Sequence, residues 1–258
     1  MTWYVAPILA ARETSLPDLT PYPPLLAGEG EPDRWNSCAM RVVFLGDSLT
    51  EGVDGASYLR ALGALVASDS LPGDFTLINA GRGGDTVLHL ARRVAQDVVP
   101  HAPDWVVVFV GVNDCRTWYV RRSFPTRANL GSLYYFLRRK GVWRAVTPQR
   151  YGDGLRTLID MLRAQTSARI ALCTPATASE ALDARAERML DCYATQAREV
   201  AQERDCVLID IRAAFHAAIA QRADSPPAGY RLTCDGVHLS ESGADLVAGI
   251  FRDWMLTL

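Results

Sequence analysis

Five short apolar runs punctuate the chain from residue 42 onward, separated by longer segments in which polar and apolar residues are mixed. The runs are VVFLG at 42–46, TLINA at 76–80, WVVVFVG at 105–111, RIALCT at 169–174 and VLIDI at 207–211. Near-continuous apolar runs are typical of parallel strands that are buried on both faces of a sheet. The pattern therefore predicts an α/β fold with one parallel sheet of five strands and helices on both of its faces.

The segments between the runs carry helix signals. Thr147-Pro148 predicts a helix start, because Thr is a good cap and Pro fits the first turn. Residues 179–203 are long, Ala-rich and charged on one side, which favours another helix. Ser240 or Ser242 is the candidate cap of a last helix. The apolar stripe of that helix consists of Leu246, Val247, Ile250, Phe251 and Trp254.

Two segments fall outside this alternation. Residues 1–39 hold many prolines and lack a sustained period, so we expect an irregular N-terminal arm or extension before one domain at 40–258. Residues 115–146 are too long for an ordinary connection between elements. We expect them to form a lid-like insertion or pocket wall.

The composition fits one globular domain. The chain has 258 residues, of which 49% are hydrophobic, enough for a single substantial core. Its formal charge of −2 argues against a nucleic-acid partner. The absence of a run of about 18 uncharged apolar residues predicts no transmembrane segment. The first residues lack the parts of a signal peptide, so we expect a cytoplasmic protein. Nothing in the composition indicates the oligomeric state.

Six cysteines are scattered along the chain without a CxxC pair, and no His stands at metal-ligand spacing from them. This spacing favours free thiols, most of them buried, over disulfides. We accordingly expect no metal and no other cofactor.

The first apolar run ends abruptly in Gly46-Asp47-Ser48. Ligands and nucleophiles in open parallel sheets lie just beyond the carboxyl ends of the strands, so Ser48 either caps a helix or attacks a substrate. A nucleophilic Ser needs a base, and the base works best when a third group orients it. His238 is the candidate base, because it lies in a polar loop with Asp235 three residues before it.

The other three histidines have less suitable surroundings. His89 and His216 fall within helix-like segments, and His101 lies in a turn before Pro103. We expect all three to lie on the surface or to serve packing.

Two further run ends carry groups that can donate hydrogen bonds to a negative oxygen, as acyl transfer requires. Residues 79–86 (NAGRGGDT) contain glycines that let backbone N–H groups approach a ligand. Residues 111–114 (GVND) contain Asn113, whose amide can point into the same crevice. Each piece alone also fits a turn, a cap or a loop. Their occurrence at three consecutive run ends favours a catalytic site.

In these blocks the sequence resembles the SGNH, or GDSL, hydrolases, a family named for a Ser, a Gly, an Asn and a His in separate blocks. Residues 46–49, 79–86, 111–114 and 235–238 match the four blocks in the family's order. The resemblance implies a flavodoxin-like, three-layer α/β/α sandwich around a five-stranded parallel sheet. It also implies that Ser48 is the nucleophile, His238 the general base and acid, and Asp235 the partner of His238.

The resemblance further implies an oxyanion hole. Its donors are the backbone N–H groups of Ser48 and Gly84 and the side-chain amide of Asn113. Gly81 and Gly83 stand close to Gly84 as alternative positions for the family's glycine.

The predicted function is that of a serine ester hydrolase of the esterase or lipase type, acting through an acyl-enzyme on a small-molecule carboxylic ester. The alternatives are a carbohydrate O-deacetylase, a lysophospholipase or thioesterase, and a non-enzymatic binding module of the same fold. In the predicted insertion, Arg116, Arg121 and Arg122 are candidates for attracting an anionic part of the substrate, and Tyr134 for holding an acyl chain. The alternative for that segment is a helix that packs on the domain.

Overall fold

The structure of the chain is a computed structural model. It describes residues 39–68, 71, 73–115, 146–180, 183–221 and 231–258. Apart from their end residues, the predicted arm at 1–39 and the predicted insertion at 115–146 lie outside the described residues. Both remain predictions.

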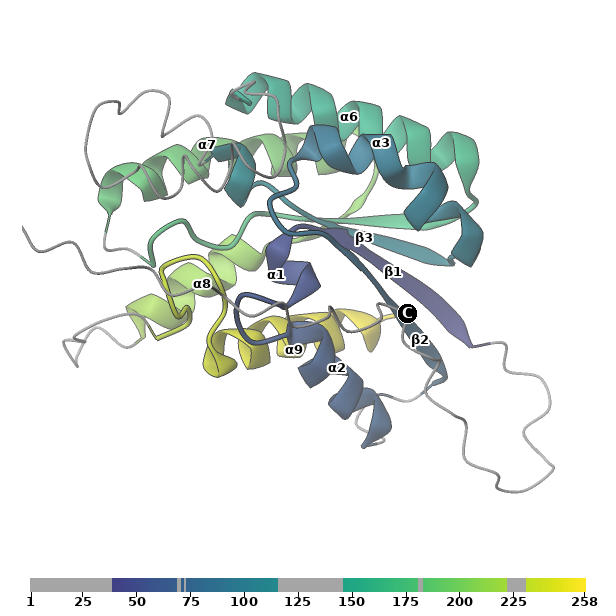
Figure 1. The fold of residues 1–258 in the computed structure, drawn as a ribbon, viewed down its shortest axis with the longest axis horizontal. Helices are drawn as coiled ribbons and strands as arrows, with labels where there is room; N and C mark the ends of the chain where they lie inside the picture. Colours follow the sequence, from purple (N-terminus) through teal and green to yellow (C-terminus); the bar gives the residue numbers. More distant parts are fainter. Residues whose placement is uncertain (1–38, 69–70, 72, 116–145, 181–182, 222–230) are drawn as a thin grey trace, which may run out of the picture. The chain divides into compact units, whose positions relative to one another are not determined.

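Five strands form one sheet in the order β2-β1-β3-β4-β5 (Figure 1). All neighbouring strands run parallel, which confirms the predicted sheet and its flavodoxin-like order. The strands are β1 (Met40–Gly46), β2 (Phe75–Gly81), β3 (Trp105–Phe109), β4 (Arg169–Cys173) and β5 (Val207–Ile209).

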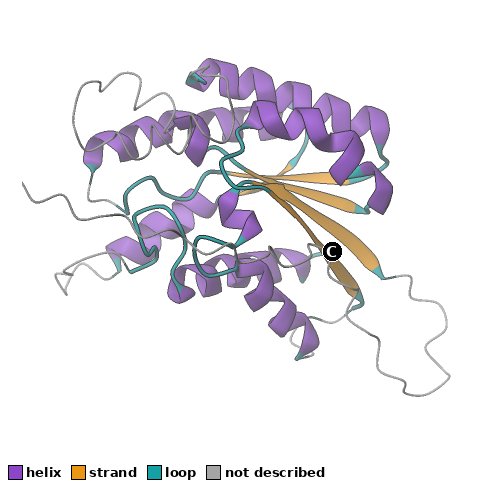
Figure 2. Cartoon of the chain, viewed as in Figure 1, coloured by secondary structure: helices purple, strands orange, loops and turns teal. Residues whose placement is uncertain are grey.

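Helices cover both faces of the sheet, as Figure 2 shows, so the chain forms a three-layer sandwich. One face packs against α3 (Val87–Asp97), α6 (Pro148–Gln165) and α7 (Ala184–Glu203). The other packs against α2 (Tyr58–Ala67), α8 (Ile211–Ala220) and α9 (Glu241–Met255). The short helices are α1 (Ser48–Glu51) and the 3-10 helix η1 (Val99–His101). Within the described ranges, no helix is long and apolar enough to cross a membrane.

The apolar run of β1 has a direct structural reason. Successive side chains of a strand point to opposite faces, and here each face meets a helical layer. Val43 and Leu45 pack on the side of α3, α6 and α7, whereas Val42 and Phe44 pack on the side of α2, α8 and α9. All four side chains are fully buried. A polar residue at any of these positions would therefore lose its hydration.

The predicted helix caps at Thr147 and Ser240 are confirmed. Each side chain accepts a hydrogen bond at 3.2 Å from the N–H group three residues ahead. The helix predicted at 179–203 begins later, at Ala184, because the Asp183 carboxylate caps it. Residues 174–180 instead form a loop after β4.

The five described cysteines are free, but the expectation that most thiols are buried is only partly correct. Cys115 and Cys173 are buried, whereas Cys192 and Cys234 are exposed. Cys115 and Val146, the two ends of the predicted insertion, both belong to the core.

A buried arginine holds the carboxyl ends of β1 and β2 together. The Arg93 guanidinium donates to the carbonyl oxygens of Gly46 at 2.8 Å and Ala80 at 2.7 Å. It also pairs with the carboxylates of Asp85 at 2.8 Å and Asp97 at 2.7 Å. Because Arg93 is only 5% exposed, these partners replace the water that its charge would otherwise need.

We predict that Arg93→Met lowers the free energy of unfolding by about 3 to 5 kcal/mol, because it removes one partner of a buried ion pair. Arg82→Met is the matched control. Its guanidinium also contacts Asp97 but is 54% exposed, so its loss should cost less than about 1 kcal/mol. Urea unfolding measures both values. Equal costs for the two variants would contradict the role given to Arg93.

Candidate active site

Ser48 stands at the first position of α1, directly beyond the carboxyl end of β1. The Asp47 carboxylate caps this helix by accepting a hydrogen bond from Leu49 N–H at 3.0 Å. Position 46 requires a glycine because there is no room for a side chain, and not because the backbone makes an unusual turn. The φ of Gly46 is not positive, and a Cβ there would stand 2.6 Å from the carbonyl oxygen of Phe109. The close packing of Gly46 against Thr50 of α1 and Phe109 of β3 thus sets the place of Ser48.

His238 lies in a turn between α8 and α9 whose shape depends on Asp235. One oxygen of the Asp235 carboxylate accepts hydrogen bonds from the N–H groups of Val237 at 2.9 Å and His238 at 2.8 Å. Its other oxygen lies 2.7 Å from His238 Nδ1. The three-residue separation noted in the sequence therefore closes a ring that orients the imidazole.

The structure brings Ser48, His238 and Asp235 into one chain of hydrogen bonds. His238 Nε2 lies 3.1 Å from Ser48 Oγ, although 190 residues separate the two in sequence. Partial burial acts to raise the pKa of the Asp235 carboxyl, but the hydrogen bonds from His238 and from Val237 N–H, together with the His238 charge, hold that pKa below its usual value. A carboxylate, an imidazole and a hydroxyl in this order match the arrangement that serine hydrolases use.

The expected oxyanion donors lie next to one another. Asn113 Nδ2 donates to the carbonyl oxygen of Asp85 at 3.0 Å and to Asp47 Oδ2 at 3.3 Å. Asp85 follows Gly84 and Asp47 precedes Ser48, so the Asn113 amide sits between the two segments that supply the backbone donors. Within the described part of the chain, the N–H groups of Ser48 and Gly84 have no acceptor.

Gly84 has a φ of 77°, a left-handed conformation that favours glycine. A Cβ built on it would meet nothing within 4 Å, so open space adjoins this position. Glu51 of α1 fixes the same loop, because its carboxylate accepts from Gly83 N–H at 2.6 Å. Among the three glycines of the block, Gly84 is the one whose conformation and surroundings suit a donor to a ligand.

Buried carboxyl groups surround Asn113. Burial raises the pKa of Asp47 to about 7, and the opposing effects of the Leu49 hydrogen bond and the His238 charge are smaller. Burial also raises the pKa of Asp114 well above its ordinary value. Both oxygens of Asp114 accept from Val87 N–H at 3.2 Å, which ties the Asn113 segment to the start of α3.

The remaining histidines lie where surface or packing roles were expected. His89 Nδ1 accepts from Thr86 N–H at 3.1 Å and so helps to cap α3. His101 and His216 are exposed.

The four residues predicted to bind substrate, Arg116, Arg121, Arg122 and Tyr134, lie outside the described residues, and their role stays a prediction. Among the residues that are described, no group of three or more His, Cys, Asp or Glu side chains could hold a metal ion.

Sequence reasoning missed Glu180, whose carboxylate fixes residues 231–233. These residues begin the turn that carries Asp235 and His238, called the catalytic turn. The Glu180 carboxylate accepts from the N–H groups of Arg231 at 2.7 Å, Leu232 at 2.8 Å and Thr233 at 2.9 Å, and from the Thr233 hydroxyl at 2.6 Å. Thr233 in turn pairs with Leu239 across the turn that carries Asp235 and His238. In this position Glu180 has a strained, left-handed backbone conformation, with a φ of 46°. No local sequence signal identifies it, because its partners lie more than 50 residues away.

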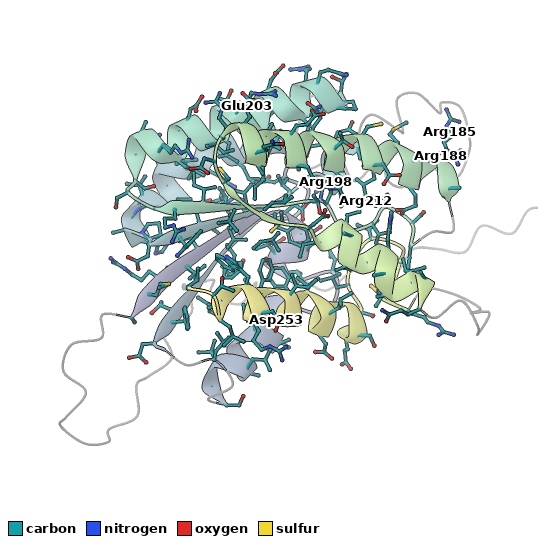
Figure 3. All side chains as sticks on the ribbon, turned by 180° about the vertical axis from the view of Figure 1, so that it is seen from behind. Arg185, Arg188, Arg198, Glu203, Arg212 and Asp253 are labelled. Carbon is teal, nitrogen blue, oxygen red and sulfur yellow. The ribbon has the colours of Figure 1, made fainter. Side chains whose placement is uncertain are left out.

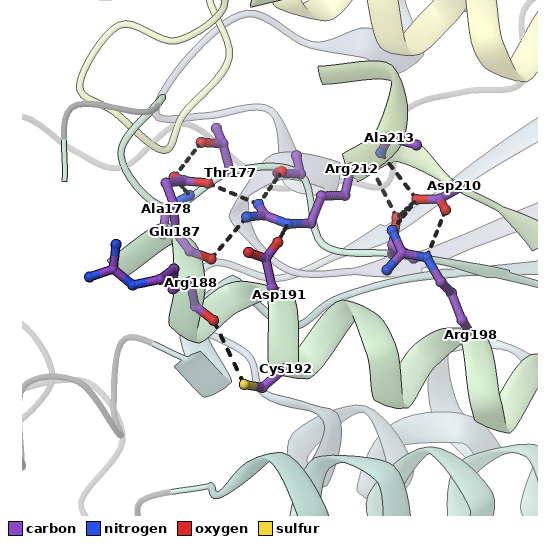
Figure 4. Close-up of polar contacts among 12 residues, drawn as sticks. Thr177, Ala178, Glu187, Arg188, Asp191, Cys192, Arg198, Asp210, Arg212 and Ala213 are labelled. Carbon is purple, nitrogen blue, oxygen red and sulfur yellow. Dashed lines mark hydrogen bonds and ion pairs between the residues drawn. The ribbon is translucent and has the colours of Figure 1, made fainter. Parts of the chain in front are cut away.

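A second acid supports the loop that carries Glu180. Figure 4 shows the Glu187 carboxylate between the loop after β4 and the guanidinium of Arg212. It accepts from Thr177 Oγ1 at 2.8 Å and Ala178 N–H at 2.9 Å, and lies 2.9 Å from Arg212 Nη1. Arg212 is 1% exposed. A continuous set of hydrogen bonds and ion pairs therefore runs from α7 and α8, through residues 177–180, to the catalytic turn.

A parallel α/β sandwich with this Ser, His and Asp arrangement beyond its strand ends defines a class, the serine hydrolases of the α/β type. Comparison with known proteins gives the family. Residues 44–246 match the GDSL-like Lipase/Acylhydrolase family, and the chain belongs to it. It is a carboxylic ester hydrolase.

Two relatives share most of their length with the chain. An acetylxylan esterase of Geobacillus stearothermophilus is 26% identical over 223 residues, which cover 82% of this chain and 91% of the relative. The crystal structure of the acetyl xylan esterase AlAXEase is 27% identical, with a TM-score of 0.66, and covers 85% of this chain and 100% of that one.

The solved structure of Axe2, an acetylxylan esterase from Geobacillus stearothermophilus, has the same fold, with 23% identity and a TM-score of 0.66. It covers 85% of this chain and 95% of that chain. Catalytic mutants of Axe2 have also been solved, in which a Ser, an Asp or a His is replaced by Ala.

We predict that Asp47→Asn changes how stability depends on pH. Between its ordinary pKa of 3.8 and about 7, Asp47 keeps its proton in the folded chain and loses it in the unfolded chain. The stability that this group contributes is therefore full below about pH 4 and declines as the pH rises to 7. Asn cannot ionise. Urea unfolding at pH 5 and pH 8 should show a larger loss in the wild type than in the variant, and equal losses would contradict the burial effect.

We predict that Glu180→Gln lowers kcat for 4-nitrophenyl acetate by about tenfold to a hundredfold, because a misplaced catalytic group costs rate. The Gln amide places N–H donors against the N–H groups of the turn. KM should change little at a temperature well below the unfolding midpoint. Glu203→Gln, at the far end of α7 (Figure 3), is the control and should keep the wild-type kcat. An unaltered kcat in Glu180→Gln would show that the turn holds its shape without this carboxylate.

Proposed function

We propose that the chain removes acetyl groups from O-acetylated carbohydrates, with Ser48 as nucleophile, His238 as general base and acid, and Asp235 as the orienting carboxylate. The observation that carries the catalytic roles is the hydrogen-bond chain from Asp235 through His238 to Ser48 Oγ. The acetylated carbohydrate is supported by the relatives, which are named for activity on acetylxylan and match over most of both chains.

In the first half of the reaction, Ser48 Oγ attacks the ester carbonyl carbon while its proton passes to His238 Nε2. The carbonyl oxygen becomes negative in the tetrahedral intermediate. His238 then gives the proton to the alcohol oxygen, the bond from this oxygen to the carbonyl carbon breaks, and the free carbohydrate hydroxyl leaves. The acetyl group remains on Ser48.

In the second half, water takes the place of the alcohol. His238 removes a proton from the water, whose oxygen attacks the acetyl carbonyl. Collapse of the second intermediate breaks the bond to Ser48 Oγ, which recovers its proton from His238, and acetic acid leaves. Asp235 stays ionised throughout and stabilises the imidazolium that forms in each half.

Three donors serve the negative oxygen in this proposal: the N–H groups of Ser48 and Gly84 and the Asn113 amide. The two backbone groups are available because they have no acceptor in the described residues. Asn113 can exchange its longer bond, 3.3 Å to Asp47, for the substrate oxygen while keeping the 3.0 Å bond to Asp85. Buried donors that are held in place before the reaction stabilise such charge with little rearrangement of the site.

The alternative functions make different demands on the catalytic residues and on the predicted insertion. An inactive binding module would have lost one of the catalytic groups, and all are present. A lysophospholipase or thioesterase would need space for a long acyl chain, and the segment expected to form such a wall is the insertion at 115–146. Acyl-chain selectivity therefore tests the choice between the two enzymatic substrate classes.

We predict that Ser48→Ala abolishes hydrolysis of 4-nitrophenyl acetate while the unfolding midpoint stays close to that of the wild type, because only the attacking oxygen is lost.

Asn113→Ala should lower kcat by about 10²-fold or more with KM little changed, since its donor meets charge that exists mainly in the transition state. A raised KM with an unaltered kcat in Asn113→Ala would remove this amide from the oxyanion hole.

We predict that kcat/KM falls steeply from 4-nitrophenyl acetate to the butyrate and octanoate esters, and that the enzyme releases acetate from acetylated xylo-oligosaccharides. Ser48→Ala is the control for spontaneous acetate loss. Preference for octanoate, together with no acetate release above that control, would favour a lipase or thioesterase role instead.

A further inference from the structure

A second carboxylate lies beside the catalytic imidazole, on the side opposite Asp235. Asp54 Oδ2 is 3.7 Å from His238 Nε2, the nitrogen that also faces Ser48 Oγ. The Asp54 side chain is 46% exposed. The hydrogen-bond chain of the triad does not use this carboxylate, which stands open to solvent where a substrate must arrive.

Asp54 is held in this place by its own loop, residues 52–57, between α1 and α2. Ala56 N–H donates to the Leu239 carbonyl oxygen at 2.8 Å, which joins the loop to the catalytic turn. Gly55 lies flat against that turn, since a Cβ on it would stand 2.6 Å from Leu239 O and 3.1 Å from His238 Cβ. A residue with a side chain at position 55 would push the loop away. The glycine therefore keeps Asp54 close to His238.

The position of Nε2 also locates the alcohol part of the ester. His238 must deliver a proton to the leaving oxygen, so that oxygen comes within about 3 Å of Nε2. A hydroxyl on the neighbouring carbon lies about one hydrogen-bond length from the leaving oxygen when the two are gauche. The Asp54 carboxylate, 3.7 Å from Nε2, is then within reach of this hydroxyl.

We propose that Asp54 is a specificity-determining residue that accepts a hydrogen bond from a free hydroxyl next to the ester-bearing oxygen. The inference rests on the proposed function, which supplies the acetyl ester. It adds the part of the alcohol that the site recognises, a vicinal diol that carries one acetyl group. An ionised carboxylate accepts such a bond and offers no donor. It also repels alcohols with an anionic group at the same position.

The test compares 2-hydroxyethyl acetate with 2-methoxyethyl acetate, whose leaving alcohols are electronically alike and differ in one donor. The wild type should favour the hydroxyl ester in kcat/KM by about fivefold to tenfold, as expected for a solvent-exposed hydrogen bond to a charged group. Asp54→Ala should reduce this ratio to about one. Asp54→Asn, which keeps an acceptor oxygen without the charge, should retain a ratio above that of Asp54→Ala.

Asp253→Ala is the matched control. It removes an exposed carboxylate from the last turn of α9 (Figure 3), about 18 Å along that helix from its start near the catalytic turn. Its ratio should equal that of the wild type. A loss of rate that is equal for both esters in Asp54→Ala would overturn the proposal, because the carboxylate would then act through His238 alone.

A wild type without preference for the hydroxyl ester would also overturn it. A different result would contradict the proposed carbohydrate substrate while leaving the role of Asp54 intact. The wild type would then discriminate between the two small esters and still release no acetate from acetylated xylo-oligosaccharides.

Discussion

The contact between His238 and Ser48 is the interaction on which the rest of the site depends, because it joins two segments that are 190 residues apart. An imidazole can deprotonate a hydroxyl only within hydrogen-bond distance, so both segments must be fixed to a fraction of an ångström. The fold meets this demand differently on each side. Ser48 is placed by strand packing and His238 by side-chain carboxylates.

On the Ser48 side, three strand ends are drawn together. Gly46 lets β1 approach the end of β3, and Arg93 donates to the carbonyl oxygens of Gly46, at the end of β1, and Ala80, near the end of β2. The common position of the proposed oxyanion donors then follows from the chain direction, since the carboxyl ends of parallel strands meet at one edge. The His238 turn does not come directly after a strand, because α8 lies between β5 and this turn. The turn is instead held by the carboxylates of Asp235 and Glu180, and Glu187 with Arg212 supports the latter.

This difference explains which features could be predicted from the sequence. The sheet, its direction and its two helical layers follow from apolar runs such as 42–46, whose residues must be buried on both faces. The segments that carry Ser48, Gly84 and Asn113 could be placed together for the same reason, because each directly follows a run. His238 and Asp235 were recognisable because the orienting pair is local, only three residues apart.

The features that were missed depend on contacts between distant segments. Glu180 was expected to lie near a helix start, and its role exists only through hydrogen bonds to residues 231–233. Asp54 looks like an ordinary loop acid until Gly55 is seen against His238. The need for a glycine at position 46 is likewise set by neighbouring segments, since a Cβ there would stand 2.6 Å from the Phe109 carbonyl oxygen. Periodicity reports burial and secondary structure, but it does not report which polar groups meet in space.

The central claim is that Ser48 forms the covalent intermediate, and peptide mapping after reaction with a fluorophosphonate tests it most directly. The account predicts one phosphonyl group per chain, found only on the peptide that contains Ser48, with loss of esterase activity in proportion to labelling. Modification at another residue, or full esterase activity in a protein whose Ser48 is completely modified, would contradict it.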